Sequence, residues 1–233
     1  ELCENGLKVL MLERGKTVEH PNYPTATKDP WELENRGQLT IEDKERCHIQ
    51  DRHYSYGGDN KHFYINDLEN PYTEVKRYDW IRADVVGGRS LLWARQCYRL
   101  SDLDFEANKK DGIAVDWPIR YKDIAPWYDY VEKVVGISGQ KEGIPHLPDS
   151  NFLPPMEMNC VEKDFKSKMA SAYPDRKITI GRTANLTEPI KGRGVCQYRN
   201  LCHRGCPYGA YFSTNASTLP AAFATGNLTL RSN

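Results

Sequence analysis

The sequence predicts an α/β fold, and three observations carry this prediction. Leu7–Leu12 is a nearly continuous apolar run of strand length, which is typical of a parallel strand covered on both faces. Gly6, directly before this run, is typical of a helix C-cap, so residues 1–5 are expected to end a helix. Residues 122–135 form a second expected helix, closed by Gly136, whose face at helical spacing carries Tyr128, Val131, Val134 and Val135.

The composition limits the classes of protein to consider. The chain has 233 residues, with 32 Lys and Arg against 32 Asp and Glu, so no excess positive charge exists to bind nucleic acid. No run of eighteen apolar residues is present, which excludes a membrane-spanning helix in this sequence. Fourteen Tyr and five Trp argue against disorder. The apolar fraction of 39% is low for a self-contained domain of this length, so we expect part of a longer protein.

Glu13 ends the first apolar run and suggests a nucleotide site. A helix end, a buried strand and an acid at the strand's tip form the second half of a dinucleotide-binding βαβ unit. In that unit the acid binds a ribose hydroxyl about 20 residues after the glycine loop, which places the loop before residue 1. The predicted class is therefore a partial Rossmann-like domain. The alternative is any buried strand that ends in Glu.

Residues 16–80 are expected to run as long loops over the surface, and loops of this length usually cover a ligand or serve a function. The segment Arg36–Cys47 is predicted to form one short helix. A pair of short strands is expected near Gly57 and Gly58, because aromatic residues alternate on both sides at Tyr54, Tyr56, Phe63 and Tyr64.

Val85–Gln96 is the most informative internal segment. Paired glycines followed by Arg and Ser let a backbone approach a large planar or phosphorylated ligand. Trp93 with its apolar neighbours would wall a ring, and two arginines would offer charge. The alternative is a tight turn with Trp93 in the core, and the pattern alone favours that alternative. The residues concerned are Gly87, Gly88, Arg89, Ser90, Leu91, Leu92 and Arg95.

The segment Gly87-Gly-Arg-Ser-x-x-Trp93, after the strand-tip Glu13-Arg-Gly15, resembles the glucose–methanol–choline (GMC) family of FAD oxidoreductases, and within it the bacterial sugar-oxidising members. Three further segments match that family in order. They are Asp116–Gly139, the cysteine segment Cys196–Ala210, and Ser217–Gly226 with Asn227–Arg231, which look like the helix and strand that rejoin the FAD-binding domain.

The resemblance implies non-covalent FAD, because Leu92 stands where pyranose oxidases carry the His that bonds to the flavin. Glu13 would hold the adenosine ribose and Arg14 would lie near the phosphates. The expected cofactor-binding residues are Glu13, Arg14, Gly87, Gly88, Arg89, Ser90, Trp93 and Ala94. The family's catalytic His is expected outside this chain, so no catalytic residue is assigned here. The implied reaction is hydride transfer from an alcohol or sugar to flavin, with an external electron acceptor or oxygen reoxidising it.

The predicted organisation has five segments. Residues 1–20 are a partial FAD-binding unit, 21–84 a loop-rich excursion, and 85–139 a flavin-contacting segment and helix. Residues 140–210 are a substrate-side, cysteine-rich segment, and 211–233 return to the FAD domain.

Cys196, Cys202 and Cys206 are spaced C-x5-C-x3-C and followed by Pro207. A disulfide or separate thiols are the first expectation. An iron–sulfur cluster, as in some related bacterial dehydrogenases of different spacing, is the second. Zinc with His203 as fourth ligand is the third, and no metal ligand is assigned.

Two other functions compete with the flavoenzyme. A nicotinamide-dependent Rossmann dehydrogenase would share the ribose acid. A non-enzymatic domain would use the cysteine-rich segment to bind metal.

Overall fold

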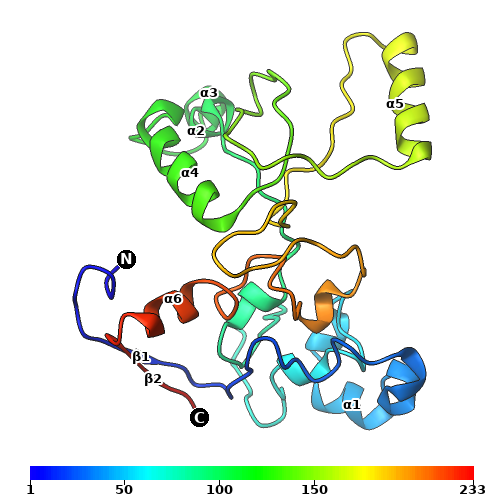
Figure 1. The fold of residues 1–233 in the computed structure, drawn as a ribbon, viewed down its shortest axis with the longest axis vertical. Coiled ribbons are helices and arrows are strands. Elements are labelled where there is room, and N and C mark those ends of the chain that lie inside the picture. The colour runs from blue at the N-terminus through cyan, green and yellow to red at the C-terminus, as the bar shows by residue number, and fades with distance from the viewer. The chain divides into compact units, whose positions relative to one another are not determined.

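The computed structural model describes residues 1–233. The chain divides into two compact units, one made of residues 1–94 with 197–233 and the other of residues 95–196 (Figure 1). The expected segments 1–20, 21–84 and 211–233 fall in the first unit. The segments 85–139 and 140–210 are each divided between the two units.

A small parallel sheet joins the two ends of the chain in the first unit. Strand β1 (Val9–Leu12) pairs in parallel with β2 (Leu228–Arg231), with Val9 opposite Leu228 (Figure 1). Helix α6 (Thr218–Ala224) leads into β2 through Gly226, whose φ is +68°. The expected strand after Gly6 and the expected helix and strand after residue 217 are therefore confirmed. The first unit combines helices with a parallel sheet, which is compatible with the predicted α/β class.

The turn before β1 has the hydrogen bonds of a helix end at Gly6, but the helix expected over residues 1–5 is absent. The amide of Leu7 donates to the carbonyl of Leu2 at 3.1 Å, and the amide of Gly6 donates to the carbonyl of Cys3 at 3.1 Å. Gly6 has φ +81°. This pair of bonds around a left-handed glycine is the Schellman motif that closes helices. The preceding residues are hydrogen-bonded turns and form no regular helix.

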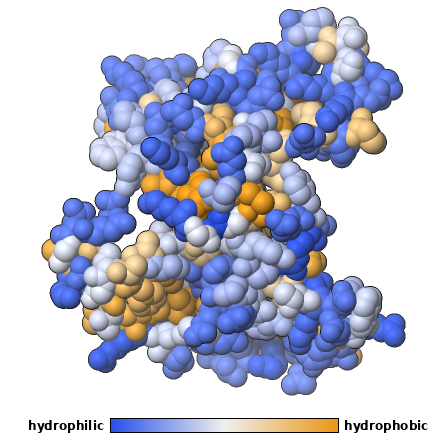
Figure 2. Space-filling view, viewed as in Figure 1, coloured by the Kyte–Doolittle hydropathy of each residue, from blue (hydrophilic) through white to orange (hydrophobic).

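The expectation that both faces of β1 are covered is wrong for these residues. Val9 and Met11 are half-buried, whereas Leu10 and Leu12 on the other face are exposed, Leu12 by 72%. Side chains alternate between the faces of a strand, and only one face of the β1–β2 pair is covered. Figure 2 shows an apolar patch over this part of the first unit.

The excursion builds a core of its own from loops. Tyr23, Phe63 and Tyr64 are buried with Val85 and Leu91 in one cluster. Short helical elements interrupt the loops. Helix α1 spans Ile41–Arg46, and the 3₁₀ turns span Pro30–Glu32, Glu34–Gly37, Gln50–Arg52, Lys61–Phe63, Gly88–Leu91 and Cys202–Arg204.

Two expectations for the excursion need correction. Helix α1 begins at Ile41, within the predicted Arg36–Cys47, because Thr40 caps it in a reciprocal box with Asp43. The pair of strands near Gly57 and Gly58 is absent. There the buried Asn60 side chain accepts from the Gly57 amide at 2.9 Å and donates to the Ser55 carbonyl at 2.6 Å, so a side chain takes the bonds that a strand partner would make.

The second unit carries four helices: α2 (Asp102–Phe105), α3 (Ala107–Asp111), α4 (Tyr121–Val135) and α5 (Cys160–Ala172) (Figure 1). Isolated bridges join Thr183 to Gln96 and to Ser138. Helix α4 ends at Gly136 with φ +81°, as the sequence predicts. No helix of either unit has the length and apolar content needed to cross a membrane.

The most buried side chain of helix α4 is charged, and the apolar face that the sequence predicts is only partly covered. Val131 and Val134 are exposed, and the buried residue of α4 is Glu132. The Arg99 guanidinium, also buried, donates to the Glu132 carboxylate at 3.0 Å and to the Tyr121 hydroxyl at 2.8 Å. A buried carboxylate requires such a partner, so this pair fixes the helix in its unit.

Candidate functional site

The two segments that the sequence singles out lie against each other in the first unit. Gly15 follows β1, and a Cβ placed on it would come 2.1 Å from the backbone carbonyl carbon of Asp84. The Val86 amide donates to the Lys16 carbonyl at 2.9 Å, and Lys16 and Val85 form a parallel bridge. Only a glycine permits this backbone approach, so the tip of β1 and the Val85–Gly88 segment form one surface.

Glu13 lies half-buried at the end of β1, where its amide donates to the Arg231 carbonyl at 2.9 Å. One carboxylate oxygen, Oε1, accepts the Gly15 amide at 2.8 Å. This bond orients the side chain at the strand tip and leaves Oε2 for a hydroxyl donor. Arg14 is exposed and lies 4.0 Å from the Asp84 carboxylate, too long for a strong ion pair in solvent.

Gly87 and Gly88 form a left-handed turn, with φ +98° and +48°. Their surroundings differ. A Cβ on Gly87 would come 1.8 Å from Oδ1 of Asn215, whereas a Cβ on Gly88 would have no heavy atom within 4 Å. The protein's own Asn215 thus approaches the backbone at Gly87, and the side of Gly88 where a Cβ would stand is open to an external group.

The polar side chains beside the turn make hydrogen bonds within the protein. The Ser90 hydroxyl donates to the Gly87 carbonyl at 2.6 Å and accepts the Thr214 amide at 3.1 Å. The Arg89 guanidinium is exposed and donates to the Ile81 carbonyl at 2.6 Å. Ser90 therefore closes the turn, and Arg89 keeps part of its donor capacity toward solvent.

Trp93 and Leu91 point in different directions. The Trp93 indole donates to the Phe212 carbonyl at 2.9 Å. Its ring is nearly perpendicular to the Phe212 ring, and the two ring centroids are 6.5 Å apart. Leu91 is completely buried in the core, so the expectation that it walls a ring is wrong. Leu92 packs partly buried against the same core. Ala94 is exposed at the last position before the second unit begins.

A third segment, residues 211–215, completes the surface, and no sequence pattern predicts its position. The Tyr211 hydroxyl donates to the Leu91 carbonyl at 3.1 Å, and Thr214 and Asn215 contact Ser90 and Gly87 as described. Asn215 belongs to a triplet, Asn-Ala-Ser, that fits the glycosylation pattern. More than a hundred residues separate this segment from Gly87, and no local pattern encodes such pairing.

The cysteine-rich segment is anchored on the excursion through Asp59. One oxygen of the Asp59 carboxylate, Oδ2, lies 2.7 Å from His203 Nε2 and accepts a bond from Arg204 Nε at 2.7 Å. Burial alone would raise the Asp59 pKa, but the hydrogen bonds from His203 and Arg204 lower it to about 2. Gly205 adds a close contact, since a Cβ there would come 2.4 Å from the Tyr23 ring. These contacts fix the 3₁₀ turn Cys202–Arg204.

All seven cysteines are present as thiols. Cys196 lies in the second unit, where its amide donates to the Leu186 carbonyl at 2.8 Å, and Cys202 and Cys206 lie in the first. The structure brings together no group of three or more His, Cys, Asp or Glu side chains able to hold a metal ion. The order of preference among disulfide, thiols and cluster is a prediction that these observations do not test.

His62 is the most perturbed histidine of the first unit. Burial, followed by the nearby charge of Lys16, lowers its pKa to about 4, so it is neutral at neutral pH. Its Nε2 is buried and makes no hydrogen bond within the protein. His62 therefore acts as a neutral, partly buried side chain beside the Phe63 ring.

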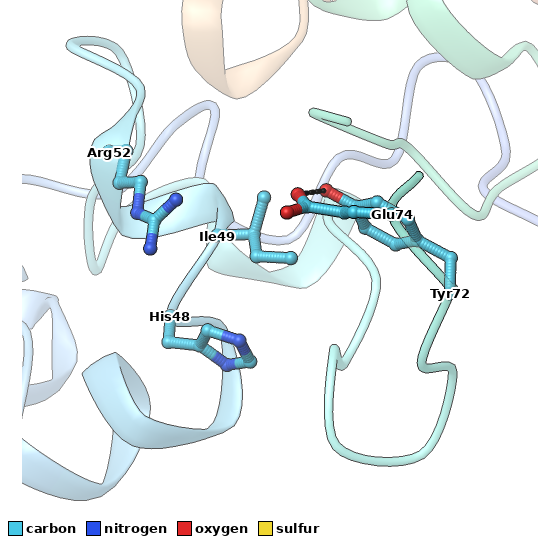
Figure 3. Close-up of a pocket in the computed structure, with 5 residues that line it drawn as sticks. All are labelled: His48, Ile49, Arg52, Tyr72 and Glu74. Carbon is cyan, nitrogen blue, oxygen red and sulfur yellow. Dashed lines mark hydrogen bonds between the residues drawn. The ribbon is translucent and has the colours of Figure 1, made fainter. Parts of the chain in front are cut away.

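One polar hollow lies away from this surface (Figure 3). It encloses about 330 Å³ and is lined by His48, Ile49, Arg52, Tyr72 and Glu74. Its polar groups are mostly engaged with the protein. Arg52 pairs with Asp79, and the Tyr72 hydroxyl contacts Glu74 at 3.2 Å and accepts the Trp80 amide at 3.0 Å. We assign it no ligand.

No protein-family model matches the chain. Comparison with characterised proteins finds similarity to 2-methyl-1,2-propanediol dehydrogenase of Mycolicibacterium austroafricanum, with 25% identity over 235 residues, covering 97% of this chain and 38% of that protein. The fructose dehydrogenase large subunit of Gluconobacter japonicus is 24% identical over 226 residues, covering 91% of this chain and 38% of that protein.

Paromamine 6′-oxidase of Streptomyces fradiae is 27% identical over 152 residues, covering 63% of this chain and 26% of that protein. These relatives are named as dehydrogenases and oxidases. The chain spans less than two fifths of the length of the relatives it matches.

The Asp59 contacts lead to a prediction about stability and pH. Asp59→Asn should lower the free energy of unfolding by about 2 kcal/mol at neutral pH, because it removes charged hydrogen bonds to His203 and Arg204. The Asp59 pKa is lower in the folded state than in the unfolded chain, so its stabilisation is present above pH 4 and is lost as the pH falls toward about 2. Urea unfolding between pH 7 and 3 measures this difference.

The matched control is Asp164→Asn, which breaks an exposed pair between Asp164 and Lys168 on α5. Such a pair contributes about 0.5 kcal/mol or less. A difference between Asp59→Asn and the wild type that stays constant from pH 7 to 3 would contradict the assigned pKa.

Proposed function

We propose that the chain is part of an FAD-dependent oxidoreductase of the glucose–methanol–choline type that oxidises an alcohol or a sugar. One observation carries the proposal. The strand-tip segment Glu13–Gly15 and the segment that leads into the turn Gly87–Gly88 lie against each other in the first unit, and the resemblance assigns both to one cofactor. Two segments 70 residues apart have no reason to meet there by local propensity alone.

The residues of this surface fit a dinucleotide. Glu13 is oriented by the Gly15 amide and keeps a carboxylate oxygen for a ribose hydroxyl. Gly88 combines a left-handed backbone with open space at its Cβ position, which is the property needed where a backbone closely approaches a ligand. Arg14 and Arg89 are exposed cations that could contact phosphates.

When bound, a flavin would supply the redox chemistry of alcohol oxidation by hydride transfer. The contribution of this chain is to bind and orient the cofactor through Glu13, the Gly87–Gly88 turn and Trp93. The catalytic His of the resembled family has no counterpart assigned in these residues. We place that residue in another part of the longer protein.

The names of the relatives support an alcohol or sugar as substrate class. One relative is named for a diol, 2-methyl-1,2-propanediol, and another for the sugar fructose. Two others are named as oxidases, one of paromamine and one of 6′′′-hydroxyparomomycin C. We therefore propose a small hydroxylated substrate, with an external electron acceptor or oxygen taking up the electrons.

A nicotinamide-dependent dehydrogenase is the main rival, because it also uses an acid at a strand tip for ribose. It offers no explanation for the Gly-Gly-Arg-Ser-x-x-Trp segment against that tip. A non-enzymatic metal-binding domain is the other rival. It finds no support in the grouping of side chains described above.

The direct test is the visible absorption spectrum of the full-length protein that contains this chain. We expect flavin bound at about one equivalent per chain and released into the supernatant on acid denaturation, because Leu92 cannot form a covalent bond to it. A colourless protein that binds NAD would favour the rival dehydrogenase. Flavin retained by the acid precipitate would contradict non-covalent binding alone.

Gly88→Val should lower the flavin content of the full-length protein sharply. The new side chain would occupy the open space at Gly88, where the cofactor is proposed to approach. Gly143→Val is the control, because Gly143 also has positive φ, +61°, and open space at Cβ, and lies in the second unit. The two variants share backbone strain of about 1 kcal/mol. Equal flavin occupancy in both would remove Gly88 from the cofactor site.

The state of the cysteine segment sets the route of the electrons. We propose thiols or a disulfide among Cys196, Cys202 and Cys206 in place of an iron–sulfur cluster, and zinc as the last alternative. Iron, zinc and acid-labile sulfide measured on anaerobically purified full-length protein should therefore be near zero. Stoichiometric iron and sulfide that are lost in Cys206→Ser would reverse the order and assign a cluster that carries electrons from the flavin.

A further inference from the structure

Asn215 is a buried polar residue beside the proposed cofactor surface, and neither the sequence patterns nor the comparisons give it a role. We propose that Asn215 is a positioning residue that holds the Gly87–Gly88 turn in the shape that receives the flavin. This inference rests on the proposed function. It adds a residue whose side chain acts through the backbone of the turn.

Both donors of the Asn215 amide are used. Nδ2 donates to the Val18 carbonyl at 2.7 Å and to the Val86 carbonyl at 3.0 Å. Val18 lies downstream of the β1 tip, and Val86 directly precedes the glycine turn. A single side chain from the segment before α6 therefore joins the other two segments of the surface.

The amide oxygen of Asn215 faces the turn itself. Oδ1 accepts the Thr214 hydroxyl at 3.3 Å and occupies the space beside Gly87, 1.8 Å from where a Cβ would stand. Asn215 can therefore take this position only because Gly87 has no side chain. With the turn supported on that side, Gly88 keeps its open side for an external group.

The burial of Asn215 supports a positioning role over a surface role. Only 6% of the residue is exposed, so the Asn-Ala-Ser triplet cannot carry a glycan in the folded protein. A buried amide with both N–H groups donated is costly to replace, because a side chain with fewer donors leaves at least one of the two carbonyl oxygens without a donor. An aspartate of the same shape would also place a carboxylate against the carbonyls of Val18 and Val86.

The hydrogen bonds of Asn215 would also be expected if this residue only stabilised the fold. The experiment must therefore separate cofactor positioning from general stability. Flavin binding stabilises the folded protein by a free energy that rises with the logarithm of the affinity. A merely structural residue lowers the melting temperatures of the apo and FAD-bound protein together. A positioning residue also lowers the affinity for FAD, and therefore shrinks the difference between the two temperatures.

The experiment uses full-length protein with Asn215→Asp and a matched control, Asn227→Asp. Asn227 also donates through Nδ2 to a backbone carbonyl, that of Cys3 at 3.0 Å, but it lies at the start of β2, away from the turn. FAD is removed and added back, and the dissociation constant, the visible circular dichroism of the flavin and both melting temperatures are measured.

We expect Asn215→Asp to weaken FAD binding by about tenfold or more, the effect of losing one or two buried hydrogen bonds, and to change the flavin circular dichroism. Asn227→Asp should keep the affinity within about twofold while lowering both melting temperatures. Equal affinity and an unchanged flavin spectrum in Asn215→Asp would overturn the positioning role. A wild-type protein that binds no flavin would overturn the proposed function, and this inference with it.

If Asn215→Asp does not fold, Asn215→Ser replaces it, because serine keeps one donor and adds no charge. Hydrogen exchange of the residue 85–92 amides in the apo protein then gives a second readout. Faster exchange confined to these amides, together with weaker FAD binding, supports the role. Exchange and FAD affinity equal to wild type in Asn215→Ser would overturn it.

Discussion

The first unit depends on the close approach of two parallel backbone segments at Gly15. Because residue 15 has no side chain, the chain leaving β1 lies directly on Asp84–Val85, and the Val86 amide reaches the Lys16 carbonyl. Any Cβ at position 15 would overlap that backbone, where no flexible side chain can yield. The loop-rich excursion begins after one of these two segments and ends at the other, and the glycine turn follows directly, so this contact fixes both ends of the excursion.

Buried polar side chains make many of the hydrogen bonds to the backbone that neighbouring strands make in other folds. Gln50 is fully buried, donates to the Asp67 carboxylate at 2.8 Å and accepts the Arg82 amide at 2.9 Å. Asn60, Asp59 and Asn215 act in the same way elsewhere in the unit. Loops have few mutual backbone bonds, so their buried amides and carbonyls need side-chain partners. This explains how a loop-rich segment with a small apolar content can still form a defined core.

For the proposed flavoenzyme, this construction places the cofactor surface on rigid supports. The strand tip, the glycine turn and residues 211–215 are separated by long stretches of sequence, yet each is fixed by hydrogen bonds to at least one of the others. Sites built in this way keep their geometry when a ligand is absent. The leucines of β1 do not follow the usual packing. They are exposed, although parallel strands are normally covered on both faces.

Local patterns determined the elements with strong local signals. Gly136 ends helix α4 and Gly6 closes the turn before β1, because a left-handed backbone suits both positions, and the apolar run before Glu13 forms β1. Pairing across long separations was decided only by the tertiary structure. The aromatic residues around Gly57 alternate as a strand would, but Asn60 supplies the hydrogen bonds instead, and Val131 and Val134 have helical spacing while Glu132 is the residue that α4 buries. Asn215 reaches Gly87 only after the chain has folded, because no local propensity encodes a contact between residues so far apart in sequence.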